Sequence, residues 1–205
     1  MKAFDFDIRQ SYMNRAESAF GGSPKFVGDY LYNSQMKLGY NALPLAPTLS
    51  PGLTYMHPAC ALDPYAQMKY QIMEAMMAPK FAGYYMYDGK DIDVGDMKYM
   101  AEANALMVRF ENIIRKGKAE KPIDLDRSSG IRIKSVDSEG LVLVSDYSTY
   151  EPVGKNVCFP ASILSGQTLI DTETNEIIRP VSGIYDVKIS ESRARLFHFR
   201  KPGIR

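Results

Sequence analysis

Asp7 and Asp88 form the one pair of carboxylates that the sequence places where general acid–base chemistry could occur. Asp7 lies near the end of an alternating apolar and acidic segment, residues 3–8, which is a predicted strand. Asp88 directly follows a second predicted strand, the aromatic run at residues 81–87. One carboxyl group that donates a proton and one that accepts it is a common catalytic arrangement, so we predict that this pair is catalytic. A simpler interpretation stays open for each: Asp88 before a glycine forms a turn, and Asp7 pairs with Arg9.

Three more side chains are predicted to contact a substrate near the same strand ends: Arg9, His57 and Tyr87. His57 lies in a long loop and could act as a hydrogen-bonding group or a proton donor, although a solvent-exposed loop position also explains it. Tyr87, like Tyr84 and Tyr85, could stack on the rings of a ligand if it faces a cleft. Aromatic residues of buried strands more commonly belong to the core, and that interpretation stays open.

Other kinds of functional site are missing from the sequence. It has no glycine-rich phosphate loop, no supported Ser-His-Asp arrangement and no His, Cys and Asp set with metal-ligand spacing. We therefore predict no cofactor and no metal. Cys60 and Cys158 lie far apart and are predicted to be two unpaired thiols. His198 is interpreted as a half-exposed strand residue rather than as a ligand.

The elements that must position these residues begin with the strand at residues 81–87, whose lack of two-residue alternation indicates burial on both faces in a parallel sheet. The acidic residues after it, Asp91, Asp93 and Asp96, are interpreted as caps of a helix. That helix is predicted to run unbroken to Gly117, which would supply a left-handed cap. Its mostly apolar stripe is predicted to face the core, and it comprises Met97, Met100, Ala101, Asn104, Met107, Val108, Glu111 and Ile114.

A third predicted strand is the short apolar run at residues 41–47, whose prolines argue against a central position in a sheet. The three predicted strands thus begin near residues 3, 41 and 81, with helical patterns between them. Strands that alternate with helices in this way point to a parallel α/β arrangement with right-handed crossovers.

The pattern changes after Pro122, where helical periodicity gives way to short β-branched runs divided by turn residues. Seven strands are predicted, at residues 131–136, 141–147, 155–159, 168–171, 176–179, 185–189 and 195–199. Their even spacing predicts an antiparallel β-sandwich. The sequence therefore predicts two domains, residues 1–121 and residues 122–205.

The composition is that of a globular protein, with 45% hydrophobic and 24% charged residues among 205 and a formal net charge of +1. The sequence has no basic run of the kind that binds nucleic acid. No segment approaches the roughly 20 apolar residues of a membrane span, and the charged first ten residues do not resemble a signal peptide. We expect a soluble protein without nucleic-acid or membrane partners, and nothing in the sequence gives its location.

Six segments carry a resemblance to a known kind of enzyme. Three are similar to barrel units: YAQMKYQIMEA at 65–75, FAGYY at 81–85 and AEAN at 101–104. Three are similar to a terminal sandwich domain: VLVSDY at 142–147, LIDTET at 169–174 and ARLFHF at 194–199. Together they resemble the C-terminal portion of a bacterial glycoside hydrolase of the amylase-like or galactosidase-like kind. The resemblance implies an α/β partial (β/α) barrel, or TIM barrel, followed by an all-β antiparallel sandwich, and a carbohydrate ligand whose O-glycosidic bond is hydrolysed.

The sequence also departs from that family. A complete eight-unit barrel needs about 250 residues, whereas the predicted sandwich begins at residue 122. The run at residues 41–47 ends without an acid. A non-catalytic carbohydrate-binding or structural protein that kept the fold is therefore the alternative. Because a partial barrel leaves open sheet edges and uncovered apolar surface, we predict a homo-oligomer, or completion of the barrel by another chain.

Overall fold

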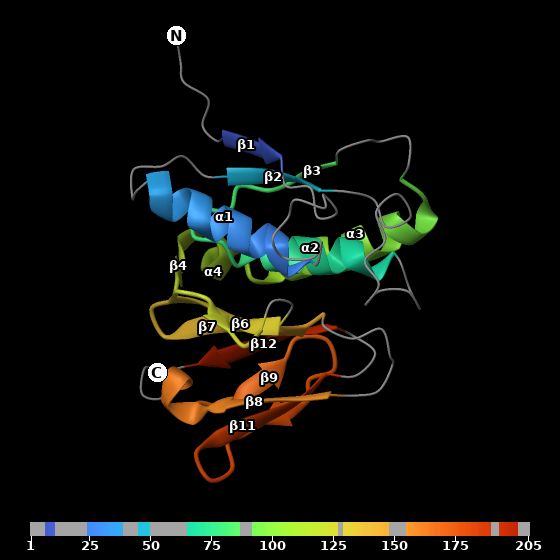
Figure 1. The fold of residues 1–205 in the computed structure, drawn as a ribbon. Helices are drawn as coiled ribbons and strands as arrows, with labels where there is room; N and C mark the ends of the chain where they lie inside the picture. The colour runs from blue at the N-terminus through green and yellow to red at the C-terminus, as the bar shows by residue number, and fades with distance from the viewer. Residues whose placement is uncertain are drawn as a thin grey trace.

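Figure 1 shows a molecule built in four layers, which are a parallel sheet, a layer of helices, a seven-stranded antiparallel sheet and a two-stranded sheet. The computed structural model describes residues 7–10, 24–38, 45–49, 65–86, 92–126, 129–147, 155–189 and 193–200. The helices have a sheet above them and a sheet below them. This arrangement decides which of their faces are buried.

The first half of the chain alternates strands and helices. Its strands are β1 (Asp7–Gln10), β2 (Leu45–Leu49) and β3 (Tyr85–Met86). Its helices are α1 (Lys25–Leu38), α2 (Ala66–Met76), α3 (Val94–Arg109) and α4 (Glu111–Lys116). The strands pair in the order β1-β2-β3, both pairings are parallel, and the helices lie on one side of the sheet (Figure 1). The predicted parallel strand–helix arrangement is confirmed for these elements.

β2 lies in the middle of the parallel sheet, and the prediction that its prolines exclude a central position was wrong. Pro47 pairs with Arg9 of β1. The pairing of β2 with β3 involves Thr48 and Leu49, which follow the proline. The missing backbone donor of Pro47 therefore does not interrupt the ladder between β2 and β3.

The predicted strand at residues 81–87 is shorter in the structure, where β3 spans only Tyr85–Met86. Gly83 interrupts the run, because its φ of 130° lies in a region that other residues rarely adopt and that does not continue a strand. Phe81 is nevertheless buried, and Tyr84 is half-buried against the helices. Phe81 and Tyr84 thus pack against the core, although the described residues of the run do not form one continuous strand.

In the second half of the chain, the described residues form only strands, turns and connecting segments apart from one 3-10 helix, Ala161–Leu164. Its strands are β4 (Lys118–Ala119), β5 (Ile123–Asp124), β6 (Ser129–Val136), β7 (Glu139–Asp146), β8 (Lys155–Pro160), β9 (Leu169–Asp171), β10 (Ile177–Ile178), β11 (Ile184–Ile189) and β12 (Ala194–Arg200). All seven predicted strands are present, and the short strands β4 and β5 were not predicted. The larger sheet has the order β10-β9-β12-β7-β6-β4, with β5 also on β6, and β8 pairs with β11 in the smaller sheet.

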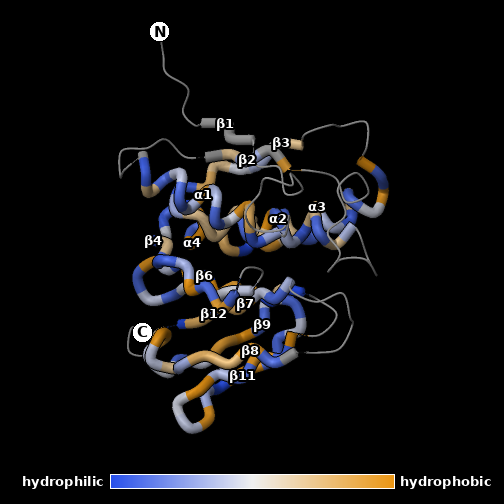
Figure 2. The backbone as a smooth tube through the Cα atoms, in the orientation of Figure 1, coloured by the Kyte–Doolittle hydropathy of each residue, from blue (hydrophilic) through white to orange (hydrophobic). Residues whose placement is uncertain are grey.

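The larger antiparallel sheet is covered on both faces, as β7 shows. Leu141 and Leu143 belong to the core shared with the helices. Val142 and Val144 belong to the core shared with β8 and β11. All four side chains are fully buried. Apolar and polar residues accordingly alternate along the outer strand β11, whereas residues 141–144 of β7 are apolar toward both layers (hydropathy in Figure 2).

α3 faces the core with a different side from the one predicted. Its buried residues, and those of α4, form the stripe Asp96, Ala103, Leu106, Phe110, Ile113 and Ile114. Met97 is 61% exposed and Val108 is 79% exposed, so the prediction that the methionine stripe packs in the core was wrong for Met97. Met100 and Met107 are partly buried at the edge of the core. The predicted stripe and the buried stripe both have helical spacing. The buried one, with its leucine, phenylalanine and isoleucines, belongs to the same core as Leu141 and Leu143.

The predicted long helix is divided at Phe110 into α3 and α4, and Gly117 does not adopt the left-handed conformation that was predicted. Its φ is −66° and its ψ is 144°, which is extended backbone. A Cβ atom at this position would lie 2.3 Å from the carbonyl oxygen of Ile113. The glycine is therefore required by the close approach of the chain to the end of α4, and not by its backbone angles.

The N-terminus of α3 carries the predicted acidic cap. Asp93 Oδ1 accepts hydrogen bonds from the backbone N–H groups of Gly95, at 2.7 Å, and Asp96, at 3.2 Å. The carboxylate of Asp96 accepts in return from the backbone N–H of Asp93, which completes a capping box. The interpretation of these two residues as caps is confirmed, and Asp91 lies outside the described residues.

We expect Asp93→Ala to lower the midpoint of thermal unfolding by roughly 2–4 °C, because two backbone donors at the start of α3 lose their acceptor. Asp93→Asn keeps an oxygen that can accept the same bonds and serves as the control, with little change expected. Differential scanning calorimetry of both variants checks this. An equal loss in the two variants would show that charge, and not the capping geometry, stabilises this end of the helix.

Candidate functional site

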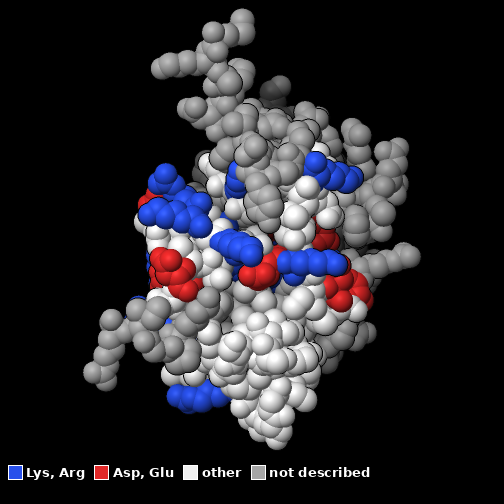
Figure 3. Space-filling model, turned by 90° about the vertical axis from the view of Figure 1, so that its left-hand side faces the viewer, with Lys and Arg blue, Asp and Glu red and all other residues white. Residues whose placement is uncertain are grey.

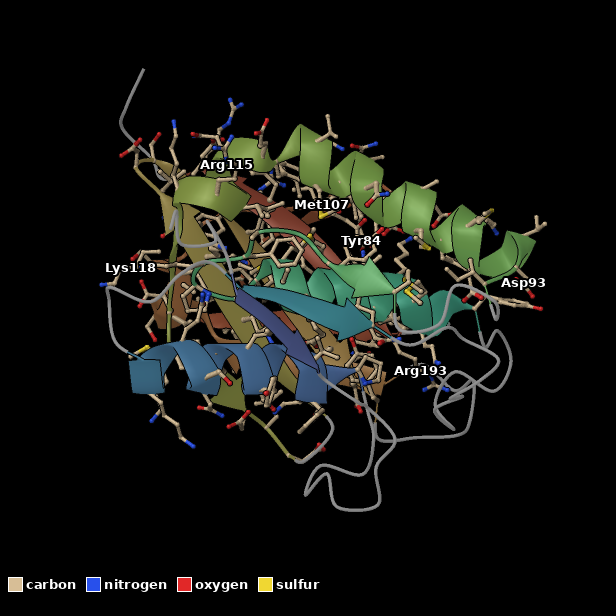
Figure 4. The ribbon with its side chains drawn as sticks, turned by 90° about the horizontal axis from the view of Figure 1, so that it is seen from above. Tyr84, Asp93, Met107, Arg115, Lys118 and Arg193 are labelled. Atoms are coloured by element: carbon tan, nitrogen blue, oxygen red, sulfur yellow. The ribbon has the colours of Figure 1, made fainter. Side chains whose placement is uncertain are left out.

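The carboxyl edge of the parallel sheet is the place where the sequence predicts a site. All three strands point the same way, toward the side of the molecule on which Asp93 begins α3 (Figure 4). The register places Gln10, Thr48 and Tyr85 side by side near this edge. The loops that follow the strands lie outside the described residues.

The structure corrects the position of Asp7. β1 begins at Asp7, which pairs with Leu45, the first residue of β2. Asp7 is thus the first described residue of β1, and three further residues of the strand follow it, whereas the sequence predicted Asp7 near the carboxyl end of the strand. At a rise of about 3.3 Å per residue, its Cα atom lies about 10 Å before the level of Gln10 along the strand. The strand continues two residues beyond its predicted end at Ile8, and the first residues of the predicted segment lie outside the described residues.

Of the other predicted site residues, His57, Tyr87 and Asp88 lie outside the described residues, and for Arg9 the structure gives the backbone position within β1. The chain order puts Tyr87 and Asp88 directly beyond β3, at the carboxyl edge. No contact among the predicted residues is described, so their meeting in one site stays a prediction.

Tyr84 is the one aromatic residue of the predicted strand end whose contacts are described in detail. Its hydroxyl donates a hydrogen bond of 3.0 Å to Asn104 Oδ1 on α3 (Figure 4). Burial raises the pKa of the Tyr84 hydroxyl, and the bond to Asn104 opposes that rise. Tyr84 packs against the helix core, which favours the structural interpretation of this tyrosine over a role in stacking on a ligand.

A buried group of charges, which we call the Arg132 network, joins the helices to the larger antiparallel sheet. Arg132 on β6 binds Glu74 on α2 through Nε, and its Nη2 lies 2.5 Å from Asp29 Oδ1 on α1. Lys25 Nζ lies 2.7 Å from Asp29 Oδ2 and 2.6 Å from Asp124 Oδ1. Of these five side chains only Asp124 is largely exposed. The network therefore connects two layers of the molecule, the helices and the larger antiparallel sheet, through charged hydrogen bonds.

The electrostatics of the Arg132 network keep both cations charged. Burial alone would lower the pKa of Arg132, but the carboxylates of Glu74 and Asp29 raise it above its usual value. Burial likewise opposes the charge of Lys25, and its hydrogen bonds to Asp124 and Asp29 raise the pKa of the ammonium group. The sequence analysis missed this network. One signal was available, since Lys25 and Asp29 are spaced for an ion pair on a helix.

Lys134 on β6 is a further buried cation, and it caps the C-terminal end of α2. Its Nζ donates to the carbonyl oxygen of Ala78 at 2.6 Å and to that of Met76 at 3.1 Å. A cation at this end of a helix is favoured by the helix dipole. The side chain is fully buried, and burial lowers the pKa of Lys134 to about 7. Its charge therefore depends on pH near neutrality.

The turn between β9 and β10 is held against the helices by a third group of charges. Lys69 on α2 lies 2.8 Å from Glu102 Oε2 on α3 and 2.9 Å from Glu173 Oε1 in the turn. Arg109 Nη1 donates to the carbonyl oxygen of Thr172 at 3.0 Å. Positive and negative side chains lie next to one another over the helix layer in Figure 3, whereas the sandwich below shows few charges on that face. These contacts position the layers and do not form an open site.

The described residues offer no alternative reactive centre. No group of three or more His, Cys, Asp or Glu side chains among them could hold a metal ion. Cys158 is an exposed free thiol, as predicted, and Cys60 lies outside the described residues. His198 is partly buried, with Nε2 3.2 Å from Glu139 Oε2, which agrees with its interpretation as a strand residue. No described helix has the length and apolar character to cross a membrane.

Comparison with solved structures identifies the fold as that of glycoside hydrolases. AmyP in complex with maltose matches 97% of this chain with a TM-score of 0.65 and 10% identity, over 56% of its own chain. An α-amylase from Anoxybacillus matches 98% of this chain with a TM-score of 0.60 and 12% identity, over 53% of its own chain. A GH27 β-L-arabinopyranosidase from Geobacillus stearothermophilus, in complex with arabinose, matches 88% of this chain with a TM-score of 0.53 and 10% identity, over 42% of its own chain.

At such low identity the likeness concerns the fold alone. The resemblance to part of a glycoside hydrolase, which the sequence predicted, is confirmed at that level. The chain spans 56% or less of the length of each of these solved structures. No family model and no curated protein matches the sequence.

Proposed function

We propose that the chain combines a partial (β/α) barrel, residues 1–121, with a C-terminal β-sandwich, residues 122–205, and that it acts on an oligosaccharide or polysaccharide. The parallel strands with helices on one side support the barrel part of this proposal. The paired antiparallel sheets support the sandwich part. The observation that carries the functional part is the fold likeness, over 97% of this chain, to a protein crystallised with maltose.

In this proposal the substrate lies at the carboxyl edge of β1, β2 and β3, because barrels of this kind bind substrates at the carboxyl ends of their strands. Asp88, directly beyond β3, would act as the acid or base, with Tyr87 and His57 in contact with the sugar. From β1, Asp7 is the candidate for the second catalytic carboxylate, and Arg9 is a candidate contact to the substrate. Asp88 is supported better than Asp7, since the backbone of Asp7 lies three residues before the carboxyl end of its strand.

A non-catalytic carbohydrate-binding or structural protein is the second candidate, and the position of Asp7 favours it. Two-carboxylate hydrolysis needs the carboxyl groups about 5 to 9.5 Å apart. Asp7 pairs with Leu45, four residues before Leu49, which pairs with Met86, the last described residue before Asp88. Such a protein would keep the sugar-binding edge without a second carboxylate in reach.

Hydrolysis of a chromogenic maltooligosaccharide separates the two candidates. We expect turnover by the wild-type chain and a loss of about 10²- to 10⁴-fold in Asp88→Asn, since the variant has no proton to transfer. Asp186→Asn, the same substitution at an exposed position of β11, is the matched control and should keep full activity. Binding without turnover would support the second candidate. Turnover that Asp88→Asn leaves unchanged would contradict the proposed role of Asp88.

A further inference from the structure

The outer side of α3 carries an apolar stripe that is open to solvent. Val94 is 83%, Met97 is 61% and Val108 is 79% exposed. Ala101 and Ala105 lie between them on the same line of the helix and are also exposed. α3 runs along the outer edge of the molecule in Figure 4, with Met107 on its inner side. An apolar line of this length on a helix surface is typical of a contact with another helix.

The stripe is symmetric about its central residue, Ala101. Val94 and Val108 lie seven residues before and after it, and Met97 and Ala105 lie four residues before and after it. A two-fold axis through Ala101 would therefore place each valine against the other valine, and each methionine against an alanine. Large side chains would meet small ones, and the alanines would allow the helix axes to approach to about 8 Å.

We propose that this stripe is a dimer interface, on which a second copy of the chain binds with its α3 antiparallel. A two-fold dimer uses the same patch on both copies, so each residue must find its partner at the mirrored position of the stripe. The arrangement of Val94, Met97, Ala101, Ala105 and Val108 meets this condition. This proposal assigns a specific interface to the homo-oligomer that the sequence predicts.

The charges at the two ends of the helix pair favour the antiparallel orientation. The amino end of α3 has the carboxylate of Asp93, and its carboxyl end has Arg109. α4 adds Arg115 and Lys116 beyond that end, and both are exposed. An antiparallel pair brings the acidic end of each copy near the basic end of the other and opposes the two helix dipoles. A parallel pair would instead bring like charges together.

The size of the stripe sets the strength of the dimer. A helix of 16 residues is about 24 Å long and offers a face about 10 Å wide. This face is well below the roughly 800 Å² per partner of a standard stable interface. We therefore expect a dimer that dissociates on dilution, with monomer and dimer in exchange.

Sedimentation velocity of the full chain over a range of concentrations tests the proposal. We expect the average mass to rise from monomer toward dimer in the wild type. Ala101→Glu places two like charges on the two-fold axis and should leave a monomer at every concentration. Asn156→Glu adds the same charge at an exposed position of β8, away from α3, and it should dimerise as the wild type does.

Disulfide trapping tests the geometry. Ala101→Cys lies on the proposed axis, so on mild oxidation it should link to itself and give a covalent dimer. Val94→Cys should not link to itself, but it should link to Val108→Cys when the two variants are mixed. The wild type, with its native cysteines, gives the background. A concentration-independent monomer, or a dimer that Ala101→Glu leaves intact, would overturn the proposal.

Discussion

Arg132→Met is expected to destabilise the protein by about 3–5 kcal/mol, because removal of one partner from a buried ion pair leaves its counter-charge without compensation. Glu74 is fully buried, and without Arg132 it keeps the hydrogen bond of 3.3 Å that the Tyr147 hydroxyl donates to its Oε1. In the same variant, Asp29 would keep its ion pair with Lys25. Because a domain of this kind has a total stability of about 5–15 kcal/mol, this single change could approach complete unfolding.

Urea denaturation followed by circular dichroism measures this loss, with Arg115→Met as the matched control. Arg115 and Glu111 form an ion pair of 2.7 Å whose side chains are 70% and 61% exposed. Pairs of this kind contribute about 0.3–0.5 kcal/mol, so the control should be nearly neutral. The double variant Glu74→Leu with Arg132→Met should recover part of the stability, since the unpaired buried charge is then removed. Equal losses in the two arginine variants would contradict the importance of the network.

The stability of the protein is expected to rise with pH from about 7 to 10 because of Lys134. In the folded chain, burial lowers the pKa of Lys134 to about 7. Without burial, as in the unfolded chain, the pKa of a lysine is 10.5. Between these two values the unfolded chain binds a proton that the folded chain does not. The free energy of unfolding then increases by about 1.4 kcal/mol per pH unit, to a total of about 5 kcal/mol. Below pH 7 both states bind the proton, and this contribution stays constant.

Lys134→Met isolates the effect, because it removes the titrating group and keeps a long side chain in the same place. Urea denaturation across this pH range should give a flatter stability profile for Lys134→Met than for the wild type. Lys188→Met, at an exposed position of β11, should leave the profile unchanged. Parallel profiles for the wild type and Lys134→Met would show that the ammonium group stays protonated in the folded chain through its bonds to Met76 and Ala78.

The sandwich strands could be predicted from the sequence because their signals are local. Runs such as residues 141–147 and 185–189 are short, β-branched and bounded by turns, and each became a strand close to its predicted bounds. β4 and β5 have two residues each, which is too short for a pattern. The order of the parallel strands was predicted correctly, but β1 and β2 each continue two residues beyond the predicted end, so Asp7 lies three residues before the end of β1.

The contacts between the layers could not be predicted from the sequence. Along β6, Ile131 and Ile133 alternate with Arg132 and Lys134, which is the pattern of a strand with one face in water. The helices cover that second face, so both cations are buried. The exposed side of α3 was misassigned for the same reason: two stripes on one helix have equal periodicity, and only the position of the sheet decides between them. Burial of this kind depends on contacts between distant parts of the chain.

The central claim, that this chain binds a sugar at the carboxyl edge of the parallel sheet, is tested most directly by titration calorimetry with maltotriose. The account predicts saturable binding to the wild-type chain that Asp88→Asn weakens and Asp186→Asn does not. Sucrose at the same concentration would control for non-specific heats of dilution. No binding of maltotriose or of longer maltooligosaccharides, by a chain shown to be folded, would contradict the account and leave the fold without a carbohydrate function.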